Sequence, residues 1–226
     1  MTTFEQTIQQ VSPDAPDATA RPVCPWLTMF VRPRQTMRQI LDRDSTRFVV
    51  PLAMLGGVLT VLNRASIESM GDRMPVSSIF AIAFPVGVIV GLIMLYLGGA
   101  VIQWTGSWFG GRATAGEMRA ALAWGRMPFY AAGLLWLPYL GFFGGEVFMG
   151  EMPSVEARPW LLLVLINLAV LDVGLGIWGL VTLVLAVAEA HRFPAWNALG
   201  SIVLGVVLIA VPLVLLAMIA AVLASF

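Results

Sequence analysis

The sequence predicts an all-α, polytopic membrane protein with five transmembrane helices. The first observation is composition: 59% of the 226 residues are hydrophobic and only 12% are charged, whereas a soluble domain usually carries about 25% charged residues. The second is the segment from Trp160 to Ala190, which is almost wholly apolar before Glu189. It exceeds the roughly 20 residues that cross a hydrocarbon core. The third is that four more apolar runs accompany it.

Residues 1–24 are expected to form a disordered tail. They are polar, contain Pro13, Pro16 and Pro22, and show no hydrophobic periodicity, so they cannot bury enough apolar surface to become ordered. They also lack the charged start and apolar run of a signal peptide, so no cleavage is expected.

Residues 25–47 are expected to form an amphipathic segment in the membrane interface. Trp26 and Phe30 lie one helical turn apart, and Pro33 suits the first position of a second helix. An apolar stripe with arginines on the other faces is typical of a helix lying flat among headgroups. The stripe is Met37, Ile40 and Leu41, and the arginines are Arg34, Arg38 and Arg43. The alternative is a helix that packs only on the protein itself.

The remaining residues, 48–226, are expected to form one five-helix domain. The expected spans are 48–66, 79–109, 128–145, 160–190 and 201–226. The second is too long for a perpendicular crossing, so it should tilt or extend beyond the membrane. Before the third, Thr114 and Glu117 have capping-box spacing, which predicts a helix that begins near Ala115.

Glycines in the first two spans indicate close helix packing. Gly56 and Gly57 could let a neighbouring helix approach the first span, and Gly87-x-x-x-Gly91 is a packing motif of apolar helices. We interpret the pair as an intramolecular packing face, with dimerisation as the alternative.

A third group of glycines, Gly174-x-Gly176-x-x-Gly179, formally matches a dinucleotide-binding fingerprint. It follows no strand and does not open a helix at an aqueous surface, so the context for phosphate binding is absent. We expect these to be packing glycines.

Few residues could support catalysis or hold a metal. Cys24 and His191 are the single cysteine and histidine, so a zinc cluster of these residue types is excluded, and no metal or other cofactor is expected. Ser-His or Cys-His catalysis would require His191, which we interpret as an interfacial polar residue after the fourth span. The 13 basic and 13 acidic residues balance, so no overall field attracts nucleic acid.

Asp172 is the polar exception inside the fourth span. A carboxylate near the bilayer centre costs about 3 kcal/mol or more. On a helix Asp172 shares the face of Gly176 and Gly179, so it should point into the bundle. Tyr96 and Tyr130 are at a depth from which they could donate hydrogen bonds, and the three form a candidate intramembrane site. Three roles remain open: a structural hydrogen-bonded carboxyl, a proton or solute site, and a partner-binding group.

The order of these pieces resembles the Yip domain family, the Ypt/Rab-interacting five-span membrane proteins. The resemblance covers about Pro25 to Phe226 and is carried by Trp26-x3-Phe30-x2-Pro33-x2-Thr36, by Pro128 after the connecting segment, and by His191-x-Phe193 with Ala198. It implies five spans and, in eukaryotic members, a link to Rab GTPases and vesicle traffic. This chain lacks their Asp-Leu-Tyr-Gly-Pro element, so the Rab role does not carry over. The resemblance therefore points to the prokaryotic branch, and no catalytic residues carry over.

These features favour a non-enzymatic scaffold or assembly factor in a bacterial inner membrane. Its expected partners are membrane lipids and other membrane proteins, with no nucleic acid, and the oligomeric state is left open. The candidate interface comprises Trp26, Phe30, Arg34, Arg38, Arg119 and Arg126. The alternative is a small-solute or proton-coupled transporter that uses Asp172 and the proline-interrupted helices.

The distribution of arginine predicts the orientation. Of the 13 basic residues, three, Arg64, Arg73 and Arg158, fall in loops on the far side of the membrane from the N-terminus, and the other ten fall on its own side. By the positive-inside rule the N-terminus is cytoplasmic, and the end of the fifth span lies on the opposite side.

Cysteine labelling tests this orientation. Once Cys24 has been replaced, a cysteine introduced at Ser154 should react with a membrane-impermeant reagent in intact cells, because residues 146–158 are predicted to be outside. Labelling of Ser154→Cys that requires cell lysis would reverse the topology.

Overall fold

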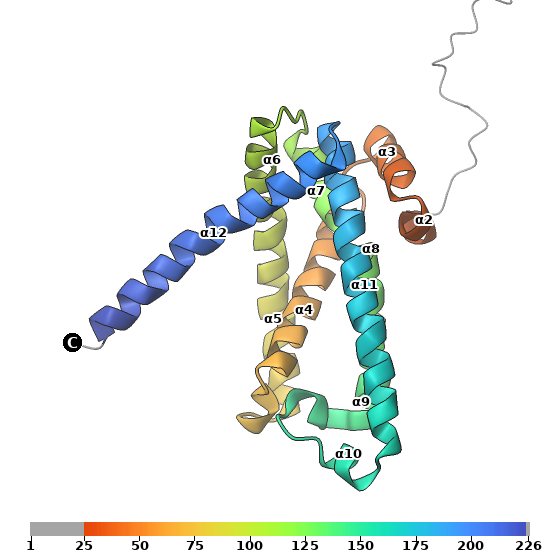
Figure 1. Ribbon diagram of the computed structural model, residues 1–226, viewed down its shortest axis with the longest axis vertical. Coiled ribbons are helices and arrows are strands. Elements are labelled where there is room, and N and C mark those ends of the chain that lie inside the picture. Colours follow the sequence, from red (N-terminus) through yellow and green to blue (C-terminus); the bar gives the residue numbers. More distant parts are fainter. Residues whose placement is uncertain (1–24, 225–226) are drawn as a thin grey trace, which may run out of the picture.

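The computed structural model describes residues 25–224, and within that range the secondary structure is entirely helical (Figure 1). Five helices or helical runs are long and apolar enough to cross a membrane: Val49–Ile67, Val76–Trp108, Ala115–Phe148, Trp160–His191 and Ala195–Leu223. The predicted all-α fold with five spans is therefore confirmed. The tail expected over residues 1–24 lies outside the described residues.

The first, fourth and fifth spans are single helices, and the second is a composite. These single helices are α4 (Val49–Ile67), α11 (Trp160–His191) and α12 (Ala195–Ala224). The second span runs from α5 (Val76–Ile93) through a π-helical turn at Met94–Gly98 into α6 (Gly99–Trp108). At 33 residues it is longer than a perpendicular crossing requires, as its sequence predicted.

The third span is broken into segments, and at Ala115–Phe148 it is longer than the span expected over 128–145. It comprises α7 (Ala115–Trp124), α8 (Met127–Ala132), a 3-10 turn at Gly133–Leu135, α9 (Trp136–Phe143) and a second 3-10 turn at Gly144–Phe148. Pro128 occupies the first turn of α8, where its missing N–H costs nothing. The capping box at the start of α7 is present: Thr114 N–H donates to Glu117 at 2.7 Å, and Glu117 N–H donates to Thr114 Oγ1 at 3.3 Å.

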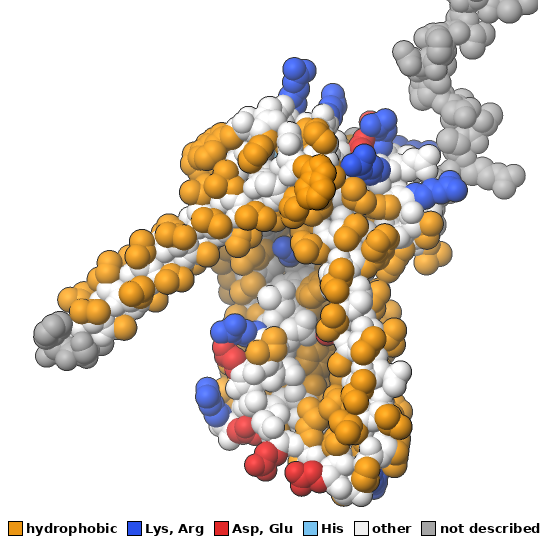
Figure 2. Space-filling model, viewed as in Figure 1, with side chains coloured by type: hydrophobic (Ala, Val, Ile, Leu, Met, Phe, Trp, Pro, Cys, Tyr) orange, Lys and Arg blue, Asp and Glu red, His pale blue; other side chains and the backbone are white. Residues whose placement is uncertain are grey.

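Short helices close both ends of the bundle. Two helices, α2 (Pro25–Val31) and α3 (Pro33–Arg43), lie beside α7, whereas α10 (Pro153–Ala157) and a 3-10 turn at Met70–Asp72 lie at the opposite end (Figure 1). We call the end with α2, α3 and α7 the arginine-rich end and the other the far end. Basic side chains gather at the first, and acidic ones are prominent at the second (Figure 2).

Glycines bring α4 and α5 into backbone contact. A Cβ atom on Gly57 would overlap the carbonyl oxygen of Gly87 and the backbone of Gly91, and one on Gly91 would overlap the carbonyl oxygen of Ala53. The Gly87–Gly91 pair is therefore an intramolecular packing face, as predicted. Gly56, on an adjacent face of α4, lies against the ring of Tyr130.

The glycines of α11 are used differently from what the sequence suggested. Nothing lies within 4 Å of a Cβ built on Gly174 or Gly176, so these two are not packing glycines. Gly179 does pack, with its built Cβ 3.4 Å from the backbone nitrogen of Phe129. The reason is that only one stripe of α11 faces the bundle, and residues 174 and 176 lie off it.

The fifth span leaves the bundle. Near its start, Thr105 Oγ1 of α6 donates a hydrogen bond to the carbonyl oxygen of Ser201 at 2.9 Å, and both residues are fully buried. Beyond Gly205 the described side chains of α12 are exposed, and the helix runs obliquely away from the other spans (Figure 1). Its apolar surface from Val206 to Leu223 is therefore not covered by the other described helices.

The α4–α5 contact predicts a selective sensitivity to added volume. Gly57→Val should lower the free energy of unfolding by about 1–3 kcal/mol or more, because two backbones must separate to admit the side chain. The matched control is Gly174→Val on α11, where the added atoms meet open space. Thermal unfolding in detergent measures both, and equal loss in the two variants would contradict the assigned packing.

Candidate functional site

The arginine-rich end is built by packing α2 and α3 onto the bundle. Met29 and Met37 are fully buried, and Ile40 is 7% exposed. The indole of Trp26 meets the ring of Phe48 edge-on at 5.8 Å and that of Trp124 at 5.2 Å. The apolar stripe of α3 is therefore covered by protein, because α3 lies against α11 and α7. This matches the alternative of a helix packed on the protein itself.

Specific polar contacts fix these short helices in place. Arg38 Nε donates to Glu189 Oε1 of α11 at 2.7 Å. The indole N–H of Trp178 donates to the carbonyl oxygen of Phe30 at 3.1 Å, and that of Trp124 donates to the carbonyl oxygen of Arg47 at 3.2 Å. Residues 25–47 are thus tied to both α7 and α11.

One face of α2 stays apolar and open. Trp26 is 44% exposed, Leu27 72% and Val31 78%, whereas Phe30 is half-buried. A patch of this kind beside arginines suits the headgroup boundary. The membrane-interface position of this segment therefore remains a prediction, now assigned to α2 rather than to the stripe of α3.

The predicted arginines occupy three different environments. Arg34 and Arg38 are exposed on α3. Arg119 is half-buried, its guanidinium 5.2 Å from the ring centre of Tyr96 and its Nε donating to the carbonyl oxygen of Ala115 at 3.1 Å. Arg126 is half-buried at the start of α8. The exposed cationic surface also includes Arg32, Arg43, Arg47, Arg112 and Arg192.

His191 locks the end of α11 against the α6–α7 connection. The side chain is 1% exposed, and its ring fills the space that a Cβ on Gly106 or Gly111 would occupy. Its Nδ1 accepts from Ala113 N–H at 3.4 Å, and its carbonyl oxygen accepts from Arg112 N–H at 3.3 Å. Nε2 has no hydrogen-bond partner within the described residues. The interpretation of His191 as an interfacial polar residue is therefore wrong, because glycines make room for the ring inside the protein.

Asp172 faces into the bundle, as predicted, but without its predicted partners. It lines a cavity of about 290 Å³ whose other polar lining residues are Asn63, Ser66, Trp136 and Tyr139. Within residues 25–224 no hydrogen bond or ion pair joins the Asp172 side chain to another residue.

The two tyrosines proposed as partners of Asp172 lie elsewhere. Tyr130 donates its hydroxyl to the carbonyl oxygen of Ala123 at 3.0 Å, and Tyr96 is 50% exposed beneath Arg119. The proposed grouping of Asp172, Tyr96 and Tyr130 is therefore wrong. A suitable depth does not place two side chains on facing sides of their helices.

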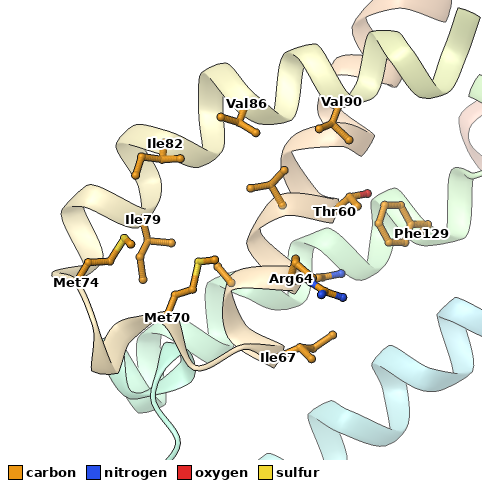
Figure 3. Close-up of a pocket in the computed structure, with 13 residues that line it drawn as sticks. Thr60, Arg64, Ile67, Met70, Met74, Ile79, Ile82, Val86, Val90 and Phe129 are labelled. Atoms are coloured by element: carbon orange, nitrogen blue, oxygen red, sulfur yellow. The ribbon is translucent and has the colours of Figure 1, made fainter. Parts of the chain in front are cut away.

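An apolar groove of about 620 Å³ lies on another side of α4 (Figure 3). It runs between α4 and α5 and is lined by side chains such as Val86, Val90 and Phe129, with Arg64 as its basic lining residue. Arg64 forms an ion pair with Glu68 one turn later. Asn63 and Ile67 line both the groove and the Asp172 cavity, so the last turns of α4 separate the two.

The family model described as the Yip1 domain matches residues 27–223, almost the whole of the described range. The chain belongs to the Yip1 domain family. No curated protein and no solved structure matches it. The short motifs that suggested this family lie at the arginine-rich end of the structure. Phe193 stacks on His191 with ring centres 4.8 Å apart, and Ala198 is fully buried.

Sequence reasoning missed the polar residues around Asp172. Two spacings could have found them: Asn63 and Ser66 lie three residues apart on α4, and Trp136 and Tyr139 lie three apart on α9. Each pair shares a helix face. Among the described residues no group of three or more His, Cys, Asp or Glu side chains could hold a metal ion.

The His191 contact predicts a reciprocal pair of substitutions. Gly106→Ala should lower the free energy of unfolding by about 1–3 kcal/mol, because the new methyl group overlaps the imidazole. His191→Ala in the same chain should recover part of that loss, since the two positions share one space. A double-mutant cycle by thermal unfolding in detergent measures the coupling.

Gly116→Ala on α7 is the matched control, because its built Cβ meets only Ser45 Oγ at 3.8 Å. Its stability should be unchanged or slightly raised, since alanine favours helix over glycine. Strictly additive effects of Gly106→Ala and His191→Ala would show that the ring and the glycine do not compete for space.

Proposed function

We propose that this Yip1-domain protein is a non-enzymatic membrane scaffold or assembly factor that binds other membrane proteins and lipids at its arginine-rich end. The observation that carries the proposal is the ordered platform formed by α2, α3 and α7. Aromatic and polar contacts fix this platform to the bundle, yet the arginines of α3 (Arg34, Arg38 and Arg43) remain exposed. A surface that is rigid before binding loses less conformational entropy when a partner docks.

The chemistry of the platform indicates its partners. Exposed arginines attract anionic headgroups, each contributing about 1 kcal/mol near such a surface. They also form paired hydrogen bonds with carboxylates, which favours acidic juxtamembrane segments of other membrane proteins. With the platform facing the cytoplasm of a bacterial inner membrane, as the arginine distribution predicts, both kinds of partner are within reach.

Transport of a small solute is the second candidate function. Its support is the cavity at Asp172, where a carboxyl group and the neutral side chains of Asn63 and Tyr139 line one space between spans. Transporters place such groups near the membrane midplane. A scaffold role needs the platform, whereas transport needs Asp172, so substitutions separate the two.

Site-specific photocrosslinking in cells tests the scaffold. A photoreactive residue at Gln35, exposed on α3, should form discrete adducts with membrane proteins, and adding Arg34→Glu should reduce them by reversing the local charge. The matched control places the same residue at Arg73, exposed at the far end.

The adducts at Gln35 should differ from those at Arg73 and should depend on charge. Identical adducts at the two positions, or adducts unaffected by Arg34→Glu, would remove the platform as the binding surface. Solute uptake that survives Arg34→Glu but disappears with Asp172→Asn in a correctly folded protein would favour transport.

A further inference from the structure

We propose that the cavity beside Asp172 is a binding site for a small organic ammonium cation. The cavity lies between α4, α9 and α11, away from the platform, so the inference does not depend on the scaffold role. It concerns binding, and its test gives the same answer whether or not the protein transports the ligand.

The first argument is the uncompensated carboxyl group. A charged carboxylate inside a membrane protein requires a cation or hydrogen-bond donors to be tolerated. The cavity lining contains no basic side chain. Arg64 follows the lining residue Asn63 in sequence, but it lines the apolar groove instead and is paired with Glu68. The cavity therefore has a place for a positive charge that the described chain does not fill.

The second argument is the direction of the neighbouring donors. The hydroxyl of Ser66 donates to the carbonyl oxygen of Val147 at 2.7 Å, and the indole N–H of Trp136 donates to Asn63 Oδ1 at 3.1 Å. Two donors that could have satisfied Asp172 are thus used elsewhere. The donors that remain in the lining, the Asn63 amide and the Tyr139 hydroxyl, are neutral. The carboxyl group is therefore the one charged group of the lining, which favours a cationic ligand over an anionic one.

The third argument is the aromatic lining. Tyr139 and Trp136 line the same cavity as the carboxyl group, and Phe148 stacks on one face of Trp136. Aromatic faces attract ammonium groups, and recognition of alkylated amines by aromatic rings with a nearby carboxylate is a recurring use of this interaction. A hard metal cation would instead need about six oxygen ligands, which one carboxyl group and a few neutral side chains do not provide.

The size and position of the cavity define the ligand class. A volume of about 290 Å³ is at the lower limit for small-molecule sites, so the ligand has few heavy atoms. Val147 and Met152 of the α9–α11 connection also line the cavity, so it extends from the far end of the bundle to Asp172. A water-soluble amine could therefore enter from the far side.

Choline and ethanolamine are suitable probes. Isothermal titration calorimetry of the full chain in a maltoside detergent, which carries no competing amine, should detect at least one of them with a Kd of about 1 mM or tighter. The uncharged carbon isostere of choline, dimethylbutanol, should bind at least about tenfold more weakly, because it retains the shape but lacks the charge. This comparison uses the unmodified protein and does not depend on a variant folding.

Two substitutions then assign the binding to the cavity. Asp172→Asn should weaken binding at least about tenfold, and Tyr139→Leu should weaken it less. Asp42 is an exposed residue of α3 at the arginine-rich end, so Asp42→Asn should leave the affinity for the probe unchanged. Failure of both probes to bind, equal binding of the isostere, or affinity unaffected by Asp172→Asn in a folded variant would each overturn the proposal. Loss of crosslinks at the platform would leave the proposal of an ammonium-binding cavity intact.

Discussion

The contact between α4 and α5 is the constraint on which the rest of the structure depends. Hydrocarbon chains are as apolar as leucine, so a bilayer supplies no hydrophobic force to hold helices together, and close van der Waals packing must do it. Here Gly57 and Gly91 allow backbone contact. Because this contact fixes the rotation of α4 about its own axis, it also fixes the direction in which the other faces of α4 point. The face that receives Tyr130 at Gly56 also carries Asn63 two turns later, and it presents Asn63 to the cavity.

The two ends of the bundle are stabilised in different ways. At the arginine-rich end, buried methionines, indole hydrogen bonds and the enclosed ring of His191 join five separate helices. The ion pair between Arg38 and Glu189 contributes little by itself, about 0.2–1 kcal/mol, because the arginine is largely exposed. Apolar packing therefore contributes most to holding the platform in place, and the ion pair adds a contact between α3 and α11. In the far half, the core instead gathers around Phe148, which stacks on Trp136 with ring centres 5.2 Å apart.

The sequence predicted those parts of the fold that the membrane itself dictates. The first span was expected over 48–66 and is Val49–Ile67, and the fourth was expected over 160–190 and is Trp160–His191, because apolar length determines both. The capping box at Thr114 and the Gly87–Gly91 packing face were predicted for equally local reasons. The fifth span begins at Ala195 rather than at residue 201, because the helix continues through a first turn that contains Asn197 and is anchored by the fully buried Ala198.

What the sequence could not provide was the rotation and interruption of helices. The residues that line the cavity with Asp172 depend on how the broken third span turns Trp136 and Tyr139 toward α11, and hydropathy carries no information on that turn. Depth alone therefore suggested Tyr96 and Tyr130 instead. The enclosure of His191 likewise depends on Gly106 and Gly111, which are distant from it in sequence. Both errors arise from contacts between segments. The i, i+3 spacings in α4 and α9 could mark polar faces, but no pattern within one segment shows which faces meet.

The candidate platform and the candidate cavity both involve α11, but we expect no energetic coupling between them. Glu189 and Asp172 lie on this helix about 25 Å apart at 1.5 Å per residue, and no described partner of Glu189 lines the cavity. Substitutions separated by more than about 10 Å with no common partner usually act additively. The cost of keeping Asp172 inside the membrane is therefore not recovered by contacts at the platform. It must be offset within the cavity itself, where the Asn63 amide and the Tyr139 hydroxyl are the neutral donors of the lining and where the proposed cation would supply the opposite charge.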